Sequence, residues 1–474
     1  MRRRALWVAA AAAVPVLRSG AALAVPLVPA TPVVPAAPVT TNKLPLVNRS
    51  DTPAAKTSDV PAALGAELSL IYFGNHFHRL VPEPGQPVAP AGATHWVDGS
   101  VGALRLWDAS TRWGDIAPSP GVWDFSRLDT YVAQARSRGA RVLYTLGSTP
   151  RWASARPDEP GPYGPGCSAE PVRMAHWEEY VRRVAERYRG RIQAYEVWNE
   201  PTFSDYARDR QYPGFFSGSV AQMVEMARIA RRVLDRVDPK AMLTTPGFVG
   251  GPHRLELFLR SGGAKLVQAV SYHFYALDGM GFNQLVLDVR ATMQQASVAH
   301  LPLWNTECGV EVYAPAEALP DGVTERLTQS GAAARLAQYL LLGAAQRIEV
   351  FFYYAWDSHR SGMIDKLGQR LPRYEALRRV QSWLLGARVA GVEQAGQTAV
   401  VVQAMRGTER FMFAWDDAAR TVRLPVPAGW RIDSVQALLD GAAPVSFPAA
   451  SAAVGAANTL ALSPAPVRLR LVRT

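Results

Sequence analysis

The chain has 474 residues, enough for a large hydrophobic core and for more than one domain. Its hydrophobic share of 48% and charged share of 19% are ordinary for a globular protein. The formal net charge is +11; four of the 51 basic residues lie in the first 24 positions, so 47 basic residues face 40 acidic ones in the remainder, an excess of +7. Such a mild excess fits a weak preference for anionic surfaces or polymers, and without a basic run carrying interleaved aromatics it does not indicate nucleic-acid binding.

The first 24 residues have the pattern of an export signal. Arg2, Arg3 and Arg4 form a positive start, Ala5–Leu17 is an apolar stretch of small residues, and Ala22-Leu23-Ala24 matches a small-residue cleavage site. The apolar stretch is short for a membrane-spanning helix, although an uncleaved anchor stays open as the alternative. We expect a signal peptide over 1–24, an exported protein (periplasmic or secreted), and no membrane span in the mature chain.

Between the signal and position 387 the chain divides into a linker and a long alternating region. Residues 25–62 are rich in Pro and Ala and have no helical or strand period, so we expect an extended linker. Over 63–387, short apolar runs alternate with longer amphipathic segments. The apolar runs are Leu68–Phe73, Ala103–Trp107, Arg141–Leu146, Ile192–Trp198, Ala241–Thr245, Val267–His273, Leu301–Asn305 and Ile348–Tyr354. The clearest helical segments are Leu128–Arg138, His176–Tyr188, Val220–Val237 and Val323–Ala345.

Eight such units predict an α/β protein with a parallel sheet covered on both sides. The number eight favours a closed (β/α)8 TIM barrel, while an open sheet stays possible from the pattern alone. After Arg388 the runs become short, alternating and β-branched, separated by Gly, Pro and Asp. We therefore expect a small C-terminal antiparallel β-domain of β-sandwich type over 388–474.

Two glutamates stand at the ends of apolar runs. Glu200 closes Tyr195-Glu196-Val197-Trp198-Asn199-Glu200-Pro201, and Glu307 closes Leu303-Trp304-Asn305-Thr306-Glu307. The carboxyl ends of barrel strands surround one cavity, so carboxylates from two strands can point at one bond. Glycoside hydrolysis needs such a pair, one as a proton donor and the other as an ionised group at the anomeric carbon.

The same motifs resemble clan A glycoside hydrolases, and the surrounding sequence is most similar to glycoside hydrolase family 39. Further matches are Leu104-Arg105-Leu106-Trp107 and the run from Tyr144 to Ala153, and the resemblance covers about 65–386. It implies Glu200 as acid/base and Glu307 as nucleophile. It also implies Asn199 as the partner of the sugar 2-hydroxyl next to the cleaved bond.

Other residues at strand ends are expected to bind substrate or to orient the two glutamates. Arg105 should keep Glu307 ionised, or else pair with Glu196 deeper in the core. The clan pattern has a His or Tyr after the sixth strand that bonds the nucleophile, and either His273 or Tyr275 could serve. The remaining candidates are His76 in the sugar pocket, and Trp356 and Trp152 as platforms for a sugar ring.

Together these features predict a retaining glycoside hydrolase acting on a poly- or oligosaccharide, an exopolysaccharide being one candidate. Two alternatives use the same cleft: a carbohydrate-binding barrel without catalysis, and a transglycosylase with the same two Glu residues. We expect no cofactor and no metal, because the eight histidines lack ligand spacing. Cys167 and Cys308 are expected at the same end of the barrel and could pair, although a lone buried cysteine usually acts as a small apolar residue.

Overall fold

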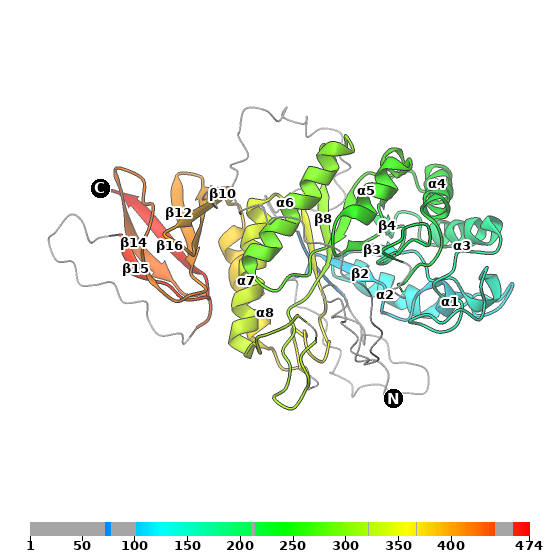
Figure 1. Cartoon of the computed structure of the whole chain (residues 1–474), viewed down its shortest axis with the longest axis horizontal. Helices are drawn as coiled ribbons and strands as arrows, with labels where there is room; N and C mark the ends of the chain where they lie inside the picture. Colours follow the sequence, from blue (N-terminus) through cyan, green and yellow to red (C-terminus); the bar gives the residue numbers. More distant parts are fainter. Residues whose placement is uncertain (1–71, 77–100, 210–213, 321, 366, 441–457) are drawn as a thin grey trace, which may run out of the picture.

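The computed structural model describes residues 72–76, 101–209, 214–320, 322–365, 367–440 and 458–474 (Figure 1), with backbone only for 72–76. The signal and linker predicted for 1–62 lie outside these residues. Within them, no helix combines the length and the apolar character needed to cross a membrane.

A parallel sheet forms the centre of the larger part of the molecule. In the described residues its order is β5-β4-β3-β2-β1-β9-β8-β7-β6. The strands are β1 (Tyr72–His76), β2 (Ala103–Leu106), β3 (Arg141–Thr145), β4 (Ala194–Glu196), β5 (Met242–Thr244), β6 (Phe248–Val249), β7 (Val270–His273), β8 (Leu303–Cys308) and β9 (Val350–Tyr353). Each predicted apolar run contributes a strand, and among the described residues this sheet has one further strand, β6.

The two ends of this strand order, β5 and β6, are neighbours in the sequence. Only Thr245, Pro246 and Gly247 separate them, and proline has no backbone donor for a continuous ladder. Two isolated parallel bridges link strands across this join, Thr244 with Ala269 and Asn199 with Gly247. The sheet therefore curves until its two ends approach each other.

Helices surround the sheet (Figure 1). They are α1 (Trp113–Ile116), α2 (Ser126–Ser137), α3 (Met174–Arg187), α4 (Val220–Val237), α5 (His253–Arg260), α6 (Gly279–Gln295), α7 (Gln329–Ala345) and α8 (Pro372–Leu384), with short 3-10 turns at Arg151–Ala153 and Gly263–Lys265. The helix predicted from Val323 begins instead at Gln329, because the Thr328 side chain accepts the backbone N–H of Gly331 and caps the helix there.

Side chains inside the curved sheet form layers. The lowest described layer is apolar: Ala103, Leu143, Ala194, Met242, Ala269, Trp304, Val350 and Phe352. Residues two positions further along a strand point to the same face. Arg105, Thr145, Glu196 and Ser271 stand in that relation to members of the apolar layer, so a buried polar layer lies directly above it.

The C-terminal part forms an antiparallel sheet of order β10-β11-β12-β16-β14 and a separate pair, β13 with β15. The strands are β10 (Arg388–Ala395), β11 (Ala399–Arg406), β12 (Glu409–Trp415), β13 (Thr421–Arg423), β14 (Trp430–Gln436), β15 (Thr459–Ala461) and β16 (Val467–Arg473). One face of the larger sheet shares an apolar cluster with β13 and β15.

The other face packs on the helices of the larger part, where Trp383 of α8 stacks on Phe413 with ring centroids 5.5 Å apart. The side-chain amide of Gln338 in α7 donates to the Asp417 carboxylate at 2.7 Å. The β-strands therefore lie beside α7, on the side seen at the left of Figure 1.

Candidate active site

Arg105 of β2 is the centre of the buried polar layer. Its side chain is fully buried, and its Nε donates to Glu196 Oε2 at 2.9 Å. Nη1 donates to Glu307 Oε2 at 2.8 Å and Nη2 to Asn199 Oδ1 at 2.8 Å. The two roles weighed for Arg105 from the sequence, partner of Glu307 and partner of Glu196, therefore occur together. One guanidinium fixes three side chains, two from β4 or its end and one from β8.

Glu196 contacts the Arg105 guanidinium directly. It is fully buried one layer below the strand ends, where it also accepts from Thr145 Oγ1 at 2.7 Å. Because a buried cation needs a paired anion, Glu196 stabilises the charge of Arg105 while leaving the upper side of the guanidinium for Glu307. Its role is to hold Arg105.

Glu307 points into the site because of an irregularity in β8. The pairing of β7 with β8 runs from Tyr272 opposite Asn305 to His273 opposite Glu307, so one extra residue is inserted into β8. Such a bulge turns the following side chains to the other face. Glu307 then accepts from Arg105 and, through Oε1, from the Tyr275 hydroxyl at 2.8 Å. Burial raises the pKa of Glu307, while the positive charge of Arg105 opposes that rise.

Glu200 is held by its backbone as well as by its side chain. Its φ of 40° lies in the left-handed region that non-glycine residues rarely adopt, and its N–H donates to the Gly247 carbonyl at 2.9 Å. Its Oε1 lies 2.8 Å from His273 Nδ1. Burial raises the pKa of Glu200 to about 7, with Arg105 opposing and Asp108 adding to the rise. A carboxyl with that pKa can hold a proton near neutral pH and release it.

The sequence left open whether His273 or Tyr275 bonds the nucleophile, and in the structure the two residues contact different glutamates. Tyr275 contacts Glu307, whereas His273 Nδ1 is 3.9 Å from Glu307 and 2.8 Å from Glu200. The histidine is therefore placed on the acid/base candidate. Gly247 lies against it: a Cβ added there would come within 2.4 Å of His273 Nε2 and 2.8 Å of Glu196 Oε1. Only glycine leaves room for both side chains.

A further carboxylate, Asp108, belongs to the same region and was missed by the sequence analysis. It accepts from Tyr163 Oη at 2.6 Å and from Tyr354 Oη at 2.9 Å. Tyr163 in turn accepts from Trp107 Nε1 at 2.8 Å. These residues come from three separate loops after β2, β3 and β9, so no local motif reveals the cluster. The position of Asp108 three residues beyond Arg105 is the one signal that could have drawn attention to it.

The expected sugar platforms have structural partners. Trp356 is only 4% exposed and packs edge-on against Tyr374, which leaves it little surface for a sugar ring. Trp152 is half-buried, donates from Nε1 to the Ala117 carbonyl at 2.8 Å and packs against Trp113. His76 ends β1, but its side chain lies outside the described residues.

Both cysteines are buried and unpaired with each other. Cys308 Sγ donates to the Phe274 carbonyl at 3.1 Å, and Cys167 lies in the loop after β3. Burial raises the pKa of both thiols. They act as small core residues in this structure.

Glu200, His273 and Glu307 each offer a possible ligand atom, and these atoms lie within 4.8 Å of one another. Such a cluster can hold a metal ion or a proton. Arg105 already donates to Glu307 from 2.8 Å and lies 3.3 Å from His273. A second cation between these groups would face a permanent positive charge, so the cluster suits proton transfer better.

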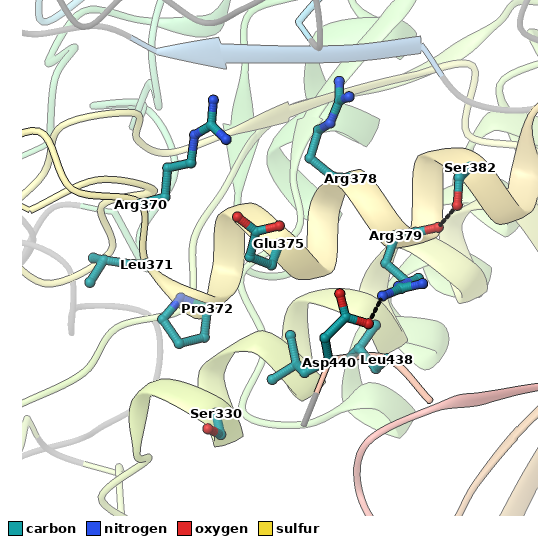
Figure 2. Close-up of a pocket in the computed structure, with 11 residues that line it drawn as sticks. Ser330, Arg370, Leu371, Pro372, Glu375, Arg378, Arg379, Ser382, Leu438 and Asp440 are labelled. Carbon is teal, nitrogen blue, oxygen red and sulfur yellow. Dashed lines mark hydrogen bonds and ion pairs between the residues drawn. The ribbon is translucent and has the colours of Figure 1, made fainter. Parts of the chain in front are cut away.

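A separate surface hollow of about 570 Å³ lies between α8 and the end of β14 (Figure 2). Its lining includes Arg370, Glu375, Arg378 and Arg379, the last of which pairs with Asp440. It contains none of the residues that surround Glu200 and Glu307. The chemistry therefore lies at the strand ends and not in this hollow.

Comparison with known proteins gives a likeness in three-dimensional structure. No protein-family model and no curated protein matches the chain. A family 39 glycoside hydrolase from the gut symbiont Bacteroides cellulosilyticus WH2 superposes with a TM-score of 0.61 at 16% identity, covering 86% of this chain and 82% of that one. A GH30 endoxylanase from Clostridium papyrosolvens C71 gives 0.53 at 13% identity, with coverage of 87% and 98%.

A GH39 enzyme from Xanthomonas axonopodis pv. citri gives a TM-score of 0.51 at 17% identity, covering 77% of this chain and 75% of that one. The chain resembles clan A glycoside hydrolases in fold. At these identities the likeness establishes the architecture, an α/β fold with a parallel sheet, and the chemistry has to be argued from the site.

Proposed function

We propose that this protein is a retaining glycoside hydrolase, with Glu307 as nucleophile and Glu200 as acid/base on a closed (β/α)8 barrel. The observation that carries the proposal is the separation of the two carboxylates, which place oxygen atoms within 4.8 Å of each other. Retaining enzymes hold their carboxyl groups about 5–5.5 Å apart, whereas inverting enzymes leave about 6.5–9.5 Å for a water molecule. The isolated parallel bridges Thr244–Ala269 and Asn199–Gly247, at the join between β5 and β6, support closure of the barrel.

The first step uses the asymmetry between the two carboxylates. Glu307, ionised beside Arg105, attacks the anomeric carbon and forms a glycosyl ester. The glycosidic C–O bond breaks, and the proton held by Glu200 moves to the departing oxygen. Asn199, kept in place by Arg105, can bond the sugar 2-hydroxyl, where a bond that strengthens in the transition state lowers the barrier.

The second step reverses the proton transfer. Glu200, now a carboxylate, takes a proton from water, and the water oxygen attacks the anomeric carbon. The ester bond breaks, and Glu307 leaves as a carboxylate that Arg105 and Tyr275 stabilise. A pKa of about 7 suits Glu200 for both directions, since a group near the working pH can give and take a proton.

We also propose that the protein acts outside the cytoplasm on an oligo- or polysaccharide. The pattern of residues 1–24 supports export, and the fold likeness to glycan-cleaving enzymes supports a carbohydrate substrate. An exopolysaccharide fits the export pattern.

The test begins with intact-mass spectrometry after incubation with a panel of 2-deoxy-2-fluoro β-glycosyl fluorides. A stable adduct that peptide mapping places on Glu307 is the expected result, and it names the sugar. Turnover of an aryl β-glycoside of that sugar should then fall by on the order of 10³-fold or more in Glu200→Gln and Glu307→Gln.

The matched control is Glu256→Gln, which removes a carboxylate of an exposed pair with Arg260 on α5 and should keep normal turnover. Azide should restore turnover of Glu200→Ala by giving the β-glycosyl azide, since azide needs no base. Near-normal activity in either catalytic variant, or an α-configured first product, would overturn the proposal.

A further inference from the structure

His273 occupies an unusual place between the two parts of the site. It ends β7 and is fully buried. Its Nδ1 lies 2.8 Å from Glu200 Oε1, and its Nε2 lies 3.3 Å from Arg105 Nη2. The ring thus connects the guanidinium that holds Glu307 with the carboxyl assigned to proton transfer.

These two contacts determine which ring nitrogen carries the hydrogen. A guanidinium has only donors and keeps its charge in proteins, and Nη2 already donates to Glu196 and Asn199, so a hydrogen on His273 Nε2 would face a cation that offers no acceptor. A neutral histidine without a hydrogen on Nε2 has its hydrogen on Nδ1. Burial, the largest cause, lowers the pKa of His273 to about 4, which agrees with a neutral ring at neutral pH.

We propose that His273 is a positioning residue that donates from Nδ1 to Glu200 Oε1 and thereby confines the catalytic proton to Oε2. An oxygen that accepts this hydrogen bond is the poorer place for a proton, because two hydrogens would then face each other. The Oε2 hydrogen is left to point toward the departing oxygen. The inference deepens the proposed function and rests on it for the meaning of the proton, although the ring geometry can be tested without substrate.

The surroundings prevent the ring from leaving this position. Gly247 lies so close that an added Cβ would meet Nε2 at 2.4 Å, and the Gly247 carbonyl also accepts the Glu200 N–H. The same short segment therefore fixes the backbone of Glu200 and the ring that bonds its side chain. A rigid arrangement of this kind is needed when one oxygen has to be selected over the other.

The first test reads the tautomer directly in the full-length wild-type protein without ligand. Long-range nitrogen-15 to proton correlation of histidine-labelled protein separates the Nδ1–H from the Nε2–H form. The signal of His273 is the one, among eight histidines, that disappears in His273→Asn. We expect a neutral Nδ1–H ring at pH 7. An Nε2–H or a doubly protonated ring would overturn the inference.

The second test uses two variants that each keep one half of the contact. In His273→Asn the amide nitrogen takes the place of Nδ1 and can still donate to Glu200. In His273→Gln the amide oxygen takes the place of Nε2 and can still accept from Arg105, but the donor to Glu200 is lost. Circular dichroism and thermal melting check that both variants fold.

The readout is the ratio of kcat/KM for phenyl and 2,4-dinitrophenyl β-glycosides of the sugar that labels Glu307. Phenolate needs a proton on leaving and dinitrophenolate does not. We expect His273→Gln to lower this ratio by about 10- to 100-fold, part of the 10²–10⁴-fold that a positioned acid contributes. In His273→Asn this ratio should fall by a factor that is several-fold smaller. Equal ratios in both variants would indicate a merely structural histidine and overturn the inference.

Failure of the inference differs from failure of the proposed function. If the protein is not a glycosidase, no fluoro sugar labels Glu307, and the tautomer measurement still decides the ring geometry. If it is a glycosidase without this role for His273, labelling succeeds while the leaving-group ratio stays unchanged.

Discussion

Replacing Glu200 with Gln should stabilise the folded protein, by an amount that grows with pH. The pKa of Glu200 rises from its ordinary value of 4.5 to about 7 in the fold, mainly through burial. Folding therefore disfavours the ionised carboxylate. Below pH 4.5 the group is protonated in both the folded and the unfolded chain, so it costs nothing. The cost develops as the pH rises from 4.5 to 7 and is complete above 7.

The gap of about 2.5 between the two pKa values corresponds to about 3 kcal/mol, at about 1.4 kcal/mol for each pKa unit. Only 18% of the Glu200 side chain is exposed, so solvent screens little of this energy. Gln carries no charge and keeps the Oε1 acceptor that His273 uses. The variant should thus gain little at pH 4.5 and about 3 kcal/mol at pH 8.

Urea denaturation of wild type and Glu200→Gln at pH 4.5, 6 and 8 gives the free energies of unfolding. Glu256→Gln serves as the control, because its side chain is exposed and its variant should follow wild type at every pH. If the difference between Glu200→Gln and wild type were the same at all three pH values, the reasoning from burial would be refuted.

Three further results are expected from the same geometry. The kcat/KM of wild type should fall as the pH rises through about 7, because Glu200 loses the proton that the first step needs; a basic limb above pH 9 would contradict this. Dialysis against EDTA should leave turnover unchanged, since the Glu200, His273 and Glu307 cluster is assigned to proton transfer; loss of turnover that zinc or calcium restores would reassign it. Gly247→Ala should lower kcat by about 100-fold or more while the protein still folds, because its Cβ would displace His273. Gly114→Ala, whose Cβ would have 3.7 Å to its nearest neighbour, should behave as wild type in the same assay.

Much of the architecture follows from local properties of the chain. Apolar runs of strand length, each followed by an amphipathic segment, can bury their two faces only in a parallel sheet covered by helices. This is why the strands appear close to their predicted positions, while the ends of helices such as α7 depend on a single cap at Thr328. The predicted run Ala241–Thr245 ended before Pro246, so the short strand β6 that follows this proline was not predicted.

The identity of the two glutamates as candidates also followed from the sequence, because each directly ends an apolar run and so had to lie at the carboxyl edge of the sheet. Their relation to each other did not. Glu307 faces Glu200 only because β8 contains an inserted residue, and the pattern of side chains along the strand conceals that insertion. Counting alternate residues would have turned Glu307 away from the site.

Contacts between strands that are distant in the sequence were decided by the tertiary structure alone. Arg105 joins Glu196 and Glu307 across 91 and 202 positions, and the sequence could only pose these partners as alternatives. Which glutamate Tyr275 and His273 each contact depends on distances that differ by about an ångström: His273 Nδ1 lies 2.8 Å from Glu200 and 3.9 Å from Glu307. The Asp108 cluster depends on three loops that meet. The sequence determined which residue types stand at the strand ends, because alternation along a strand is a local property. The curvature of the sheet decided which of them meet, because it sums the twist of every strand.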